Sequence, residues 1–441
     1  MDDKMEFIGK ARSFFAPFAA LLLATCLSVA CAAQGLPKAT PEQVGLSSQR
    51  LGSISDWLRS EIGQGKVPGA VLMVVRGGKI AYVDAIGQRD PASPAAMKVD
   101  DIFRIYSMTK PIVSVAALML VEEGKLVLEA PVARYIPSFG AVRVGVEKTD
   151  AQGQKSLELV APVRPMTVQD LMRHTSGLTY GFFGDGMVKK AYQDANITAG
   201  GDISNADFVE RLARMPLAYQ PGSTWDYSNS TDVLGRVIEV VSGQTLSGFL
   251  KARLLDPLGM KDTSFYVPEP ERQARIAEPF ANDRSLGVNA PVFDPRRVQA
   301  MESGGGGLMS TAADYARFLM MLRNGGQLDG RRYLSPATLA YMSSNQLSAA
   351  VTRTALYLPG TGYGFGLGFA VRTSAGEAAN ASSLGEITWG GAGGTYWWLD
   401  PGYDMFVVFM MQSPAQRVAY RAILRNMVYG AITEARLPAS P

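Results

Sequence analysis

The fold is decided around residues 103–111, which read Phe103-Arg104-Ile105-Tyr106-Ser107-Met108-Thr109-Lys110-Pro111. Ser107 and Lys110 are three positions apart, and residues at this spacing share one face of a helix. The apolar run over 112–123, followed by a glycine, predicts a buried helix. Pro111 fits only in the first turn of such a helix, where amide hydrogens lack partners. The sequence therefore places a hydroxyl and an amine together at the start of a buried helix.

At that position Ser107 would lie near free backbone N–H groups and the positive end of the helix dipole, which favour an oxyanion. A lone S-x-x-K motif is weak evidence, because ordinary Ser and Lys usage gives about one chance match in a chain of this length. The alternative interpretation is a capping serine followed by a solvated lysine. Here the motif occurs once and opens a buried helix, which favours a serine nucleophile.

The composition is that of an ordinary globular protein. Of the 441 residues, 47% are hydrophobic and 19% are charged, and the formal net charge is +3. So small a positive excess, without a clustered Lys/Arg stripe, gives no support for nucleic-acid binding. The single histidine, His174, excludes a His-rich metal site and is the one base available to a Ser-His-Asp triad. We expect no metal and no cofactor.

The N-terminus predicts an export signal. Residues 1–12 carry basic side chains, residues 14–29 are apolar, and small residues follow over 30–33. This pattern is typical of a cleaved signal peptide over 1–33, and it is too short and wrongly flanked for a membrane span. We expect a secreted or periplasmic protein.

Both cysteines, Cys26 and Cys31, lie in this predicted signal peptide. The mature domain, residues 34–441, would therefore have no disulfide, no cysteine metal site and no cysteine nucleophile. A lipid anchor at Cys31 is disfavoured, because the residue three positions before it is Ser28 rather than leucine.

Patterned segments at both ends of the chain predict one antiparallel sheet. The β-branched runs 70–76 and 79–86 flank a Gly-Gly pair and predict a hairpin. Further strands are predicted over 365–372, 386–389, 395–399 and 405–411, and helices over 47–62, 167–173, 233–242, 310–322 and 416–433. We therefore expect an α/β fold, an α+β sandwich with a sheet built from about 41–105 and 300–441. A mostly helical part, about 106–299, would be inserted between them.

Three further stretches contain side chains or glycines that could support chemistry. His174 could be a general base, but a buried imidazole that ties down a turn is favoured, because Ser107 already has an amine neighbour and the chain lacks a G-x-S-x-G elbow. Tyr227 lies in the chain's one Y-x-N, on a loop; it is either an ordinary loop tyrosine or a catalytic side chain. The glycine run 303–308 lacks the G-K-[ST] ending of a phosphate-binding loop, so no nucleotide site is expected.

Together these motifs resemble the serine β-lactamase/penicillin-binding-protein superfamily, in particular its class C β-lactamase-like branch and the family VIII carboxylesterases. The resemblance covers about 41–433 and rests on Ser107-Met108-Thr109-Lys110, His174-Thr175-Ser176-Gly177, Tyr227-Ser228-Asn229, Ser303-Gly304-Gly305-Gly306-Gly307-Leu308 and Trp389-Gly390-Gly391. Several motifs in the family's order are far more specific than one S-x-x-K. The resemblance implies a β-lactamase/DD-peptidase-like fold with the active site between the sheet and the helical part.

The resemblance also implies catalytic roles. Ser107 would be acylated, Lys110 and Tyr227 would form its base, and Asn229 would contact the substrate or the lysine. The chemistry of these side chains agrees with that reading, because a serine hydroxyl is a poor nucleophile until a neighbour takes its proton. Free lysine and tyrosine both titrate near about pH 10, so the pair must share or shift a proton, and its assignment to one of them stays open.

The third motif decides the expected substrate. Gly390 and Gly391 would let a substrate approach the strand closely, and the backbone N–H of Ala392 would form an oxyanion hole with that of Ser107. Penicillin-recognising relatives usually have the lysine of K-T-G where this chain has Trp389. A cation there offsets the desolvation of a substrate carboxylate, whereas indole has one N–H, no charge and a broad apolar face. Neutral esters are therefore favoured over anionic lactams.

We expect a serine carboxylesterase that cleaves small, short-chain esters through an acyl-enzyme at Ser107. The alternatives are a β-lactamase or D-amino-acid peptidase of the same fold, and an acyltransferase with an acceptor other than water. From another class, a non-catalytic penicillin-binding-like surface protein is opposed by the intact Ser107, Lys110 and Tyr227. The expected partner is a small ester, with no nucleic acid and no membrane span; the oligomeric state is left open.

Overall fold

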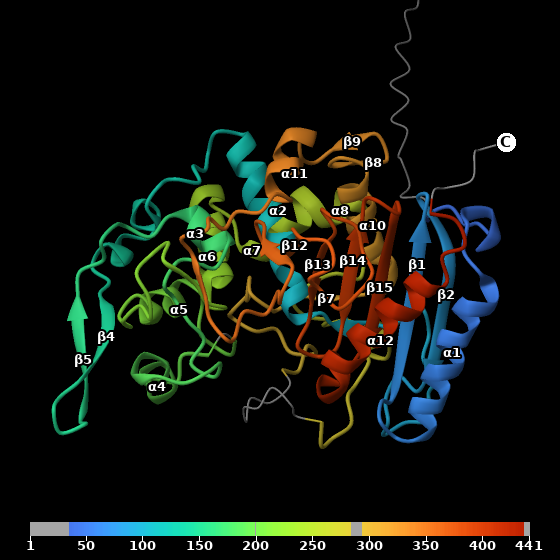
Figure 1. The fold of residues 1–441 in the computed structure, drawn as a ribbon, viewed down its shortest axis with the longest axis horizontal. Coiled ribbons are helices and arrows are strands. Elements are labelled where there is room, and N and C mark those ends of the chain that lie inside the picture. The colour runs from blue at the N-terminus through green and yellow to red at the C-terminus, as the bar shows by residue number, and fades with distance from the viewer. Residues whose placement is uncertain (1–34, 199, 284–292, 436–441) are drawn as a thin grey trace, which may run out of the picture. The chain divides into compact units, whose positions relative to one another are not determined.

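The main sheet has seven antiparallel strands in the order β11-β12-β13-β14-β15-β1-β2 and lies to one side of the mostly helical part (Figure 1). The computed structural model describes residues 35–198, 200–283 and 293–435. The strands of this sheet are β1 (Gly69–Arg76), β2 (Lys79–Gly87), β11 (Tyr363–Phe365), β12 (Ala370–Arg372), β13 (Ile387–Gly390), β14 (Tyr396–Asp400) and β15 (Met405–Met411). β1 pairs with β15 from Ala70↔Met411 to Arg76↔Met405 and with β2 on its other edge. The prediction of one sheet from both chain ends is confirmed.

Helices cover both faces of the sheet, because successive side chains of a strand point to opposite faces. The four main covering helices are α1 (Ser48–Gly63), α2 (Thr109–Glu122), α10 (Ala312–Arg323) and α12 (Arg417–Gly430). On β1, Leu72 and Val74 belong to one core with α1 and α12, whereas Val71 and Met73 belong to the other core with α2 and α10. All of β1 is buried, which explains why its sequence is apolar without alternation.

Most of the remaining helices lie between β3 (Phe103–Arg104) and its partner β7 (Met309–Ser310) in the chain. They are α3 (Val168–Met172), α4 (Met187–Asp194), α5 (Asn205–Leu212), α6 (Ser230–Ser242), α7 (Leu246–Leu250), α8 (Asp256–Leu258) and α9 (Pro270–Gln273), with the π-helical turn η5 (Lys251–Leu255) and the 3-10 turns η2 (Tyr106–Met108), η3 (Val132–Arg134) and η4 (Pro137–Gly140). α2 is buried from Thr109 to Leu120 and packs against α6. Thr167 caps α3 in a capping box with Asp170, as its sequence predicts.

Short elements complete the described chain. They are η1 (Glu42–Val44), α11 (Pro336–Met342), η6 (Pro414–Gln416) and the two-stranded pairs β4 (Val144–Thr149) with β5 (Lys155–Val160), β6 (Thr224–Trp225) with β10 (Thr352–Arg353), and β8 (Gln327–Leu328) with β9 (Arg331–Arg332).

Two predictions of local structure were wrong. The run 365–372 is not one strand, because the chain turns between β11 and β12 at Gly368. The φ of this residue is 104°, a value that glycine adopts readily and other residues rarely adopt. The β4–β5 hairpin lies in the part predicted to be helical. Its strands are mostly exposed and polar, so they lack the apolar alternation that identifies a strand in sequence.

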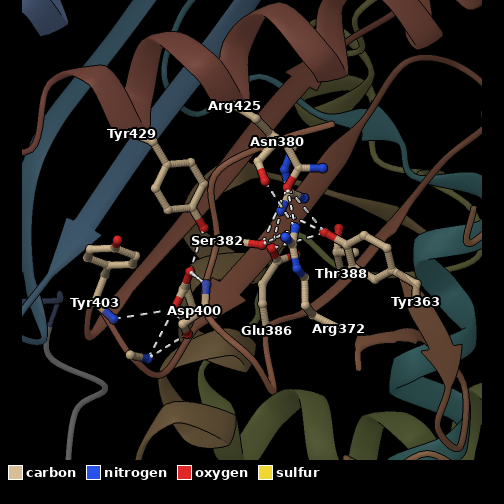
Figure 2. A network of polar contacts seen from close by, with 12 residues as sticks. Tyr363, Arg372, Asn380, Ser382, Glu386, Thr388, Asp400, Tyr403, Arg425 and Tyr429 are labelled. Carbon is tan, nitrogen blue, oxygen red and sulfur yellow. Dashed lines mark hydrogen bonds and ion pairs between the residues drawn. The ribbon is translucent and has the colours of Figure 1, made fainter. Parts of the chain in front are cut away.

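A buried polar network fixes α12 to one end of the sheet (Figure 2). Arg425 of α12 forms a buried ion pair with Glu386, which precedes β13. Arg425 also donates to Tyr396 Oη over 2.6 Å, and Tyr429 Oη donates to Asp400 over 2.6 Å. These bonds fasten the turn of α12 that contains Arg425 and Tyr429 to the sheet.

The signal peptide predicted over 1–33, with Cys26 and Cys31, lies outside the described residues. From Gly35 onward the chain forms one compact unit, so the division into a part over 41–105 and 300–441 and a part over 106–299 stays an interpretation. Among the described residues, no helix combines the length and the apolar character needed to cross a bilayer.

Candidate active site

Ser107 lies in the 3-10 turn η2, directly before α2 rather than inside it. The preceding backbone is held by β3–β7 pairing and by the bond from Ile105 N to Leu308 O, 3.0 Å long. Tyr106, next to the nucleophile, has a φ of 44°, in the left-handed region that residues with a side chain rarely adopt. Such a conformation persists only where surrounding contacts impose it, and it is typical of functional sites.

Lys110 is buried, and its side-chain nitrogen is the centre of the site. Nζ donates to Ser107 Oγ over 3.3 Å, to the Gly305 carbonyl over 2.7 Å and to Tyr180 Oη over 3.4 Å. It also lies over the ring of Tyr227, 4.4 Å from the centroid. The i, i+3 spacing therefore brings the amine to the serine hydroxyl, as predicted from the sequence.

A buried carboxylate, Asp232 of α6, lies behind the lysine. Asp232 Oδ1 accepts from Ser303 Oγ over 2.6 Å and from Gly305 N over 3.0 Å. Burial raises the pKa of Asp232, and the nearby Lys110 lowers it in part. A side chain at Gly305 would overlap the Asp232 carboxylate, so the glycine run serves to bring backbone groups between Asp232 and Lys110.

Tyr227 lies between Lys110 and the third motif. Its Oη accepts a hydrogen bond from Trp389 Nε1 over 3.3 Å, and the two ring centroids are 5.6 Å apart. In the described part of the chain no hydrogen bond joins Tyr227 Oη to Ser107 or Lys110, so the lysine meets this tyrosine through the ring face. Trp389 is buried and adds an apolar wall beside the phenol.

His174 and Asn229 have mainly structural contacts. His174 is buried, with Nδ1 3.2 Å from Ser228 Oγ and its ring 4.8 Å from that of Tyr227. Burial, assisted by Lys110, holds the pKa of His174 well below its usual value, so the imidazole is neutral. Asn229 is also buried and donates to the Thr179 carbonyl over 2.9 Å. Neither side chain makes a hydrogen bond to Ser107 or Lys110 among the described residues.

The third motif ends β13 and turns toward the nucleophile. A side chain at Gly391 would overlap the Ile105 carbonyl, and one at Gly390 would overlap the Arg421 guanidinium. Each glycine thus has a packing requirement within the chain, while its predicted contact with substrate stays a prediction.

The backbone N–H groups of Ser107 and Ala392 are both free. In the described ranges neither N–H donates a hydrogen bond to another group, and both residues are partly accessible to solvent. Gly391, the residue before Ala392, packs against the Ile105 carbonyl two residues before Ser107, and the oxyanion hole expected from these two N–H groups stays a prediction.

Tyr180 and Asp232 are not among the residues predicted from the sequence. Both lie near motif residues, because Tyr180 follows His174 by six positions and Asp232 follows Tyr227 by five. Burial raises the pKa of Tyr180 well above its usual range, with a smaller effect of Asp232, so Tyr180 is a protonated neighbour of Lys110 rather than a base. Within the described residues no cluster of three or more His, Cys, Asp or Glu side chains is placed to hold a metal ion.

Comparison with known proteins identifies the family. The family profile described as Beta-lactamase matches residues 54–428. The chain belongs to this family. It lies within the serine β-lactamase/penicillin-binding-protein superfamily and is a serine hydrolase of the β-lactamase fold.

Two relatives are named as esterases. The chain is 34% identical over 386 residues to Esterase EstB of Burkholderia gladioli, covering 82% of this chain and 91% of that protein. It is 30% identical over 364 residues to Lovastatin esterase of Penicillium rubens, covering 78% and 88% of the two chains. Among solved structures, EstCE1, described as a hydrolase with promiscuous acyltransferase activity, aligns with a TM-score of 0.72 at 27% identity, covering 88% of this chain and 98% of that chain.

Proposed function

We propose that this member of the β-lactamase family is a carboxylesterase of the family VIII type, which hydrolyses small, short-chain carboxylic esters. The observation that carries the proposal is the 3.3 Å contact between Ser107 Oγ and the buried Lys110 Nζ. The two relatives named as esterases support the same reaction class.

The reaction proceeds through an acyl-enzyme. Ser107 Oγ attacks the ester carbonyl and gives its proton to the base formed by Lys110 and Tyr227. The C–O bond to the alcohol breaks, and that proton passes to the departing alkoxide. Water then attacks the Ser107 ester, gives one proton to the same base and releases the carboxylic acid, with the proton returned to Ser107 Oγ. The N–H groups of Ser107 and Ala392 hold the oxyanion in both halves.

The substrate class follows from the surroundings of Tyr227. Trp389 stands where a lysine would meet the carboxylate of a lactam, and its N–H is already bonded to Tyr227 Oη over 3.3 Å. Desolvation of a neutral ester on entering such a site costs little free energy. An anion loses its hydration, and no cation at this position offsets that cost. Asn229 is proposed to contact the substrate or Lys110.

Parallel assays with p-nitrophenyl butyrate and a chromogenic cephalosporin test the proposal. Ester turnover should exceed cephalosporin turnover and should vanish in Ser107→Ala, and intact-mass spectrometry after a fluorophosphonate should place one adduct on Ser107. Faster cephalosporin turnover would instead indicate a β-lactamase. No turnover of either substrate would favour a non-catalytic binding protein.

Acyl transfer is a second candidate, favoured by the description of EstCE1 as a hydrolase with promiscuous acyltransferase activity. Adding a primary alcohol to the ester assay and measuring the new ester by chromatography tests it. We also propose that the enzyme is exported, which N-terminal sequencing of the mature protein would check against cleavage near residue 33.

A further inference from the structure

Arg421 reaches the third motif from α12, on the face of the sheet opposite Trp389. It lies one helical turn before Arg425, whose buried ion pair with Glu386 anchors the helix (Figure 2). Gly390 has no side chain in the space that the guanidinium occupies; a Cβ there would overlap Arg421 Nη2. The contact therefore depends on both the anchored helix and the glycine of the motif.

The guanidinium binds backbone carbonyls of the turn between β13 and β14. Nη2 donates to Gly391 O over 2.7 Å and to Thr395 O over 3.3 Å. Gly391 O also accepts from Gly394 N over 3.2 Å, and Gly391 N donates to Thr395 O over 2.8 Å. The Gly391 carbonyl thus has two donors, one of them a cation.

Arg421 has no carboxylate partner among the described residues, and its Nε is buried without a hydrogen bond. Burial lowers the pKa of Arg421 to about 10, so the group remains charged at neutral pH. A partly buried cation without an anion is costly to fold around. Groups that destabilise the fold in this way are found mainly at functional sites.

The geometry of the peptide bond connects this cation to the nucleophile. In a trans peptide the C=O and the N–H point in opposite directions. The carbonyl that Arg421 binds belongs to the Gly391–Ala392 peptide, whose N–H is the free donor of Ala392. A cation on the carbonyl oxygen fixes the plane of that peptide and polarises its N–H, which strengthens the bond to an anionic acceptor.

We propose that Arg421 is a positioning residue of the oxyanion hole, which orients and polarises the Gly391–Ala392 peptide so that Ala392 N–H stabilises the oxyanion formed at Ser107. This inference rests on the proposed acyl transfer through Ser107. Arg421 acts through the peptide and does not itself touch the substrate.

The test compares Arg421→Gln, which keeps a hydrogen-bond donor without the charge, with Arg421→Lys, which keeps the charge. Removing a whole oxyanion-hole donor costs about 10²–10³ in kcat, so weakening one should lower kcat of Arg421→Gln about tenfold with KM little changed. Arg421→Lys should be intermediate. Arg50→Gln, at an exposed site on α1, is the matched control and should keep wild-type kcat.

A thionoester separates positioning from simple structural damage. Sulfur accepts hydrogen bonds poorly, so the wild-type preference for p-nitrophenyl butyrate over its thiono analogue should shrink about tenfold in Arg421→Gln. An equal loss on both substrates, or wild-type kcat with an unchanged preference, would overturn the inference. So would a loss confined to mono-p-nitrophenyl glutarate, because that result would make Arg421 a binding group for anionic substrates.

If Arg421→Gln does not fold, the same ratio measured in Arg421→Lys decides, because its altered hydrogen-bond geometry should also reduce the preference. Absence of ester turnover by the wild-type protein would overturn the proposed function as well, whereas active wild type with an unaltered Arg421→Gln overturns this inference alone.

Discussion

The two ends of β13 differ in whether a nearby arginine has a carboxylate partner. At its start, Arg425 is paired with the buried carboxylate of Glu386. At its end, the cation Arg421 donates to the carbonyls of Gly391 and Thr395 and has no carboxylate partner among the described residues. An ion pair holds two elements together. A cation without an anionic partner can instead stabilise negative charge on a reacting group through its electrostatic field. We therefore expect substitutions at the start of β13 to change stability and those at its end to change rate.

Lys110→Met gives the largest expected effect. Methionine keeps the apolar stem but removes the amine that meets Ser107 Oγ, so kcat/KM for p-nitrophenyl butyrate should fall about 10⁴-fold, the upper range for losing a general base. The free energy of unfolding in urea should fall by only about 1–2 kcal/mol, because Lys110 loses hydrogen bonds to Ser107, Gly305 and Tyr180 but no direct ion pair. A large loss of stability would show that Lys110, like Arg425, mainly stabilises the fold, and would contradict the expected difference between the two residues.

Glu386→Gln should show the reverse pattern. Loss of the carboxylate leaves Arg425 buried and unpaired, which should lower the free energy of unfolding by about 3 kcal/mol. The ester kcat of the folded fraction should stay within about twofold of wild type. Urea unfolding and active-site titration with a fluorophosphonate measure the two quantities on one sample.

Asp170 extends the comparison to a second matched carboxylate. Burial would raise the pKa of Asp170, but hydrogen bonds from Arg164 and Thr175 outweigh it and lower the pKa to about 2. A carboxylate with a depressed pKa stabilises the fold above its unfolded pKa of about 4 and loses that contribution as the pH falls toward 2. Asp170→Asn should thus be about 2 kcal/mol less stable than wild type at pH 7. The deficit should shrink between pH 4 and about pH 2, and a constant deficit across that range would contradict the assignment.

Trp389→Phe should have the smallest effect. It removes the hydrogen bond to Tyr227 Oη and keeps an aromatic wall, so kcat for the butyrate ester should change about threefold. Stability should stay within about 1 kcal/mol of wild type. A loss larger than that of Arg421→Gln would mean that the indole N–H, rather than the guanidinium, controls this end of β13.

Local patterns predicted the sheet and the centre of the site. The i, i+3 spacing of Ser107 and Lys110, the hairpin of β1 and β2 and the capping box at Thr167 are all set by neighbours a few positions away. Arg421 could not be predicted in this way, since its contact with Gly391 joins residues of two distant elements. The β4–β5 hairpin was missed for another reason, because its exposed strands have no apolar face to reveal their period.

The pairing of β1 with β15 has a consequence for how the protein is made. Arg76 meets Met405, so β1 has no partner on that edge until β15, far along the chain, has left the ribosome. Contacts between such distant segments form slowly, because the entropy of closing a long loop is lost before the contacts can stabilise the chain. The β1–β15 edge therefore stays open while β15 is still to be made, and a polypeptide in that state can still be threaded through a narrow channel.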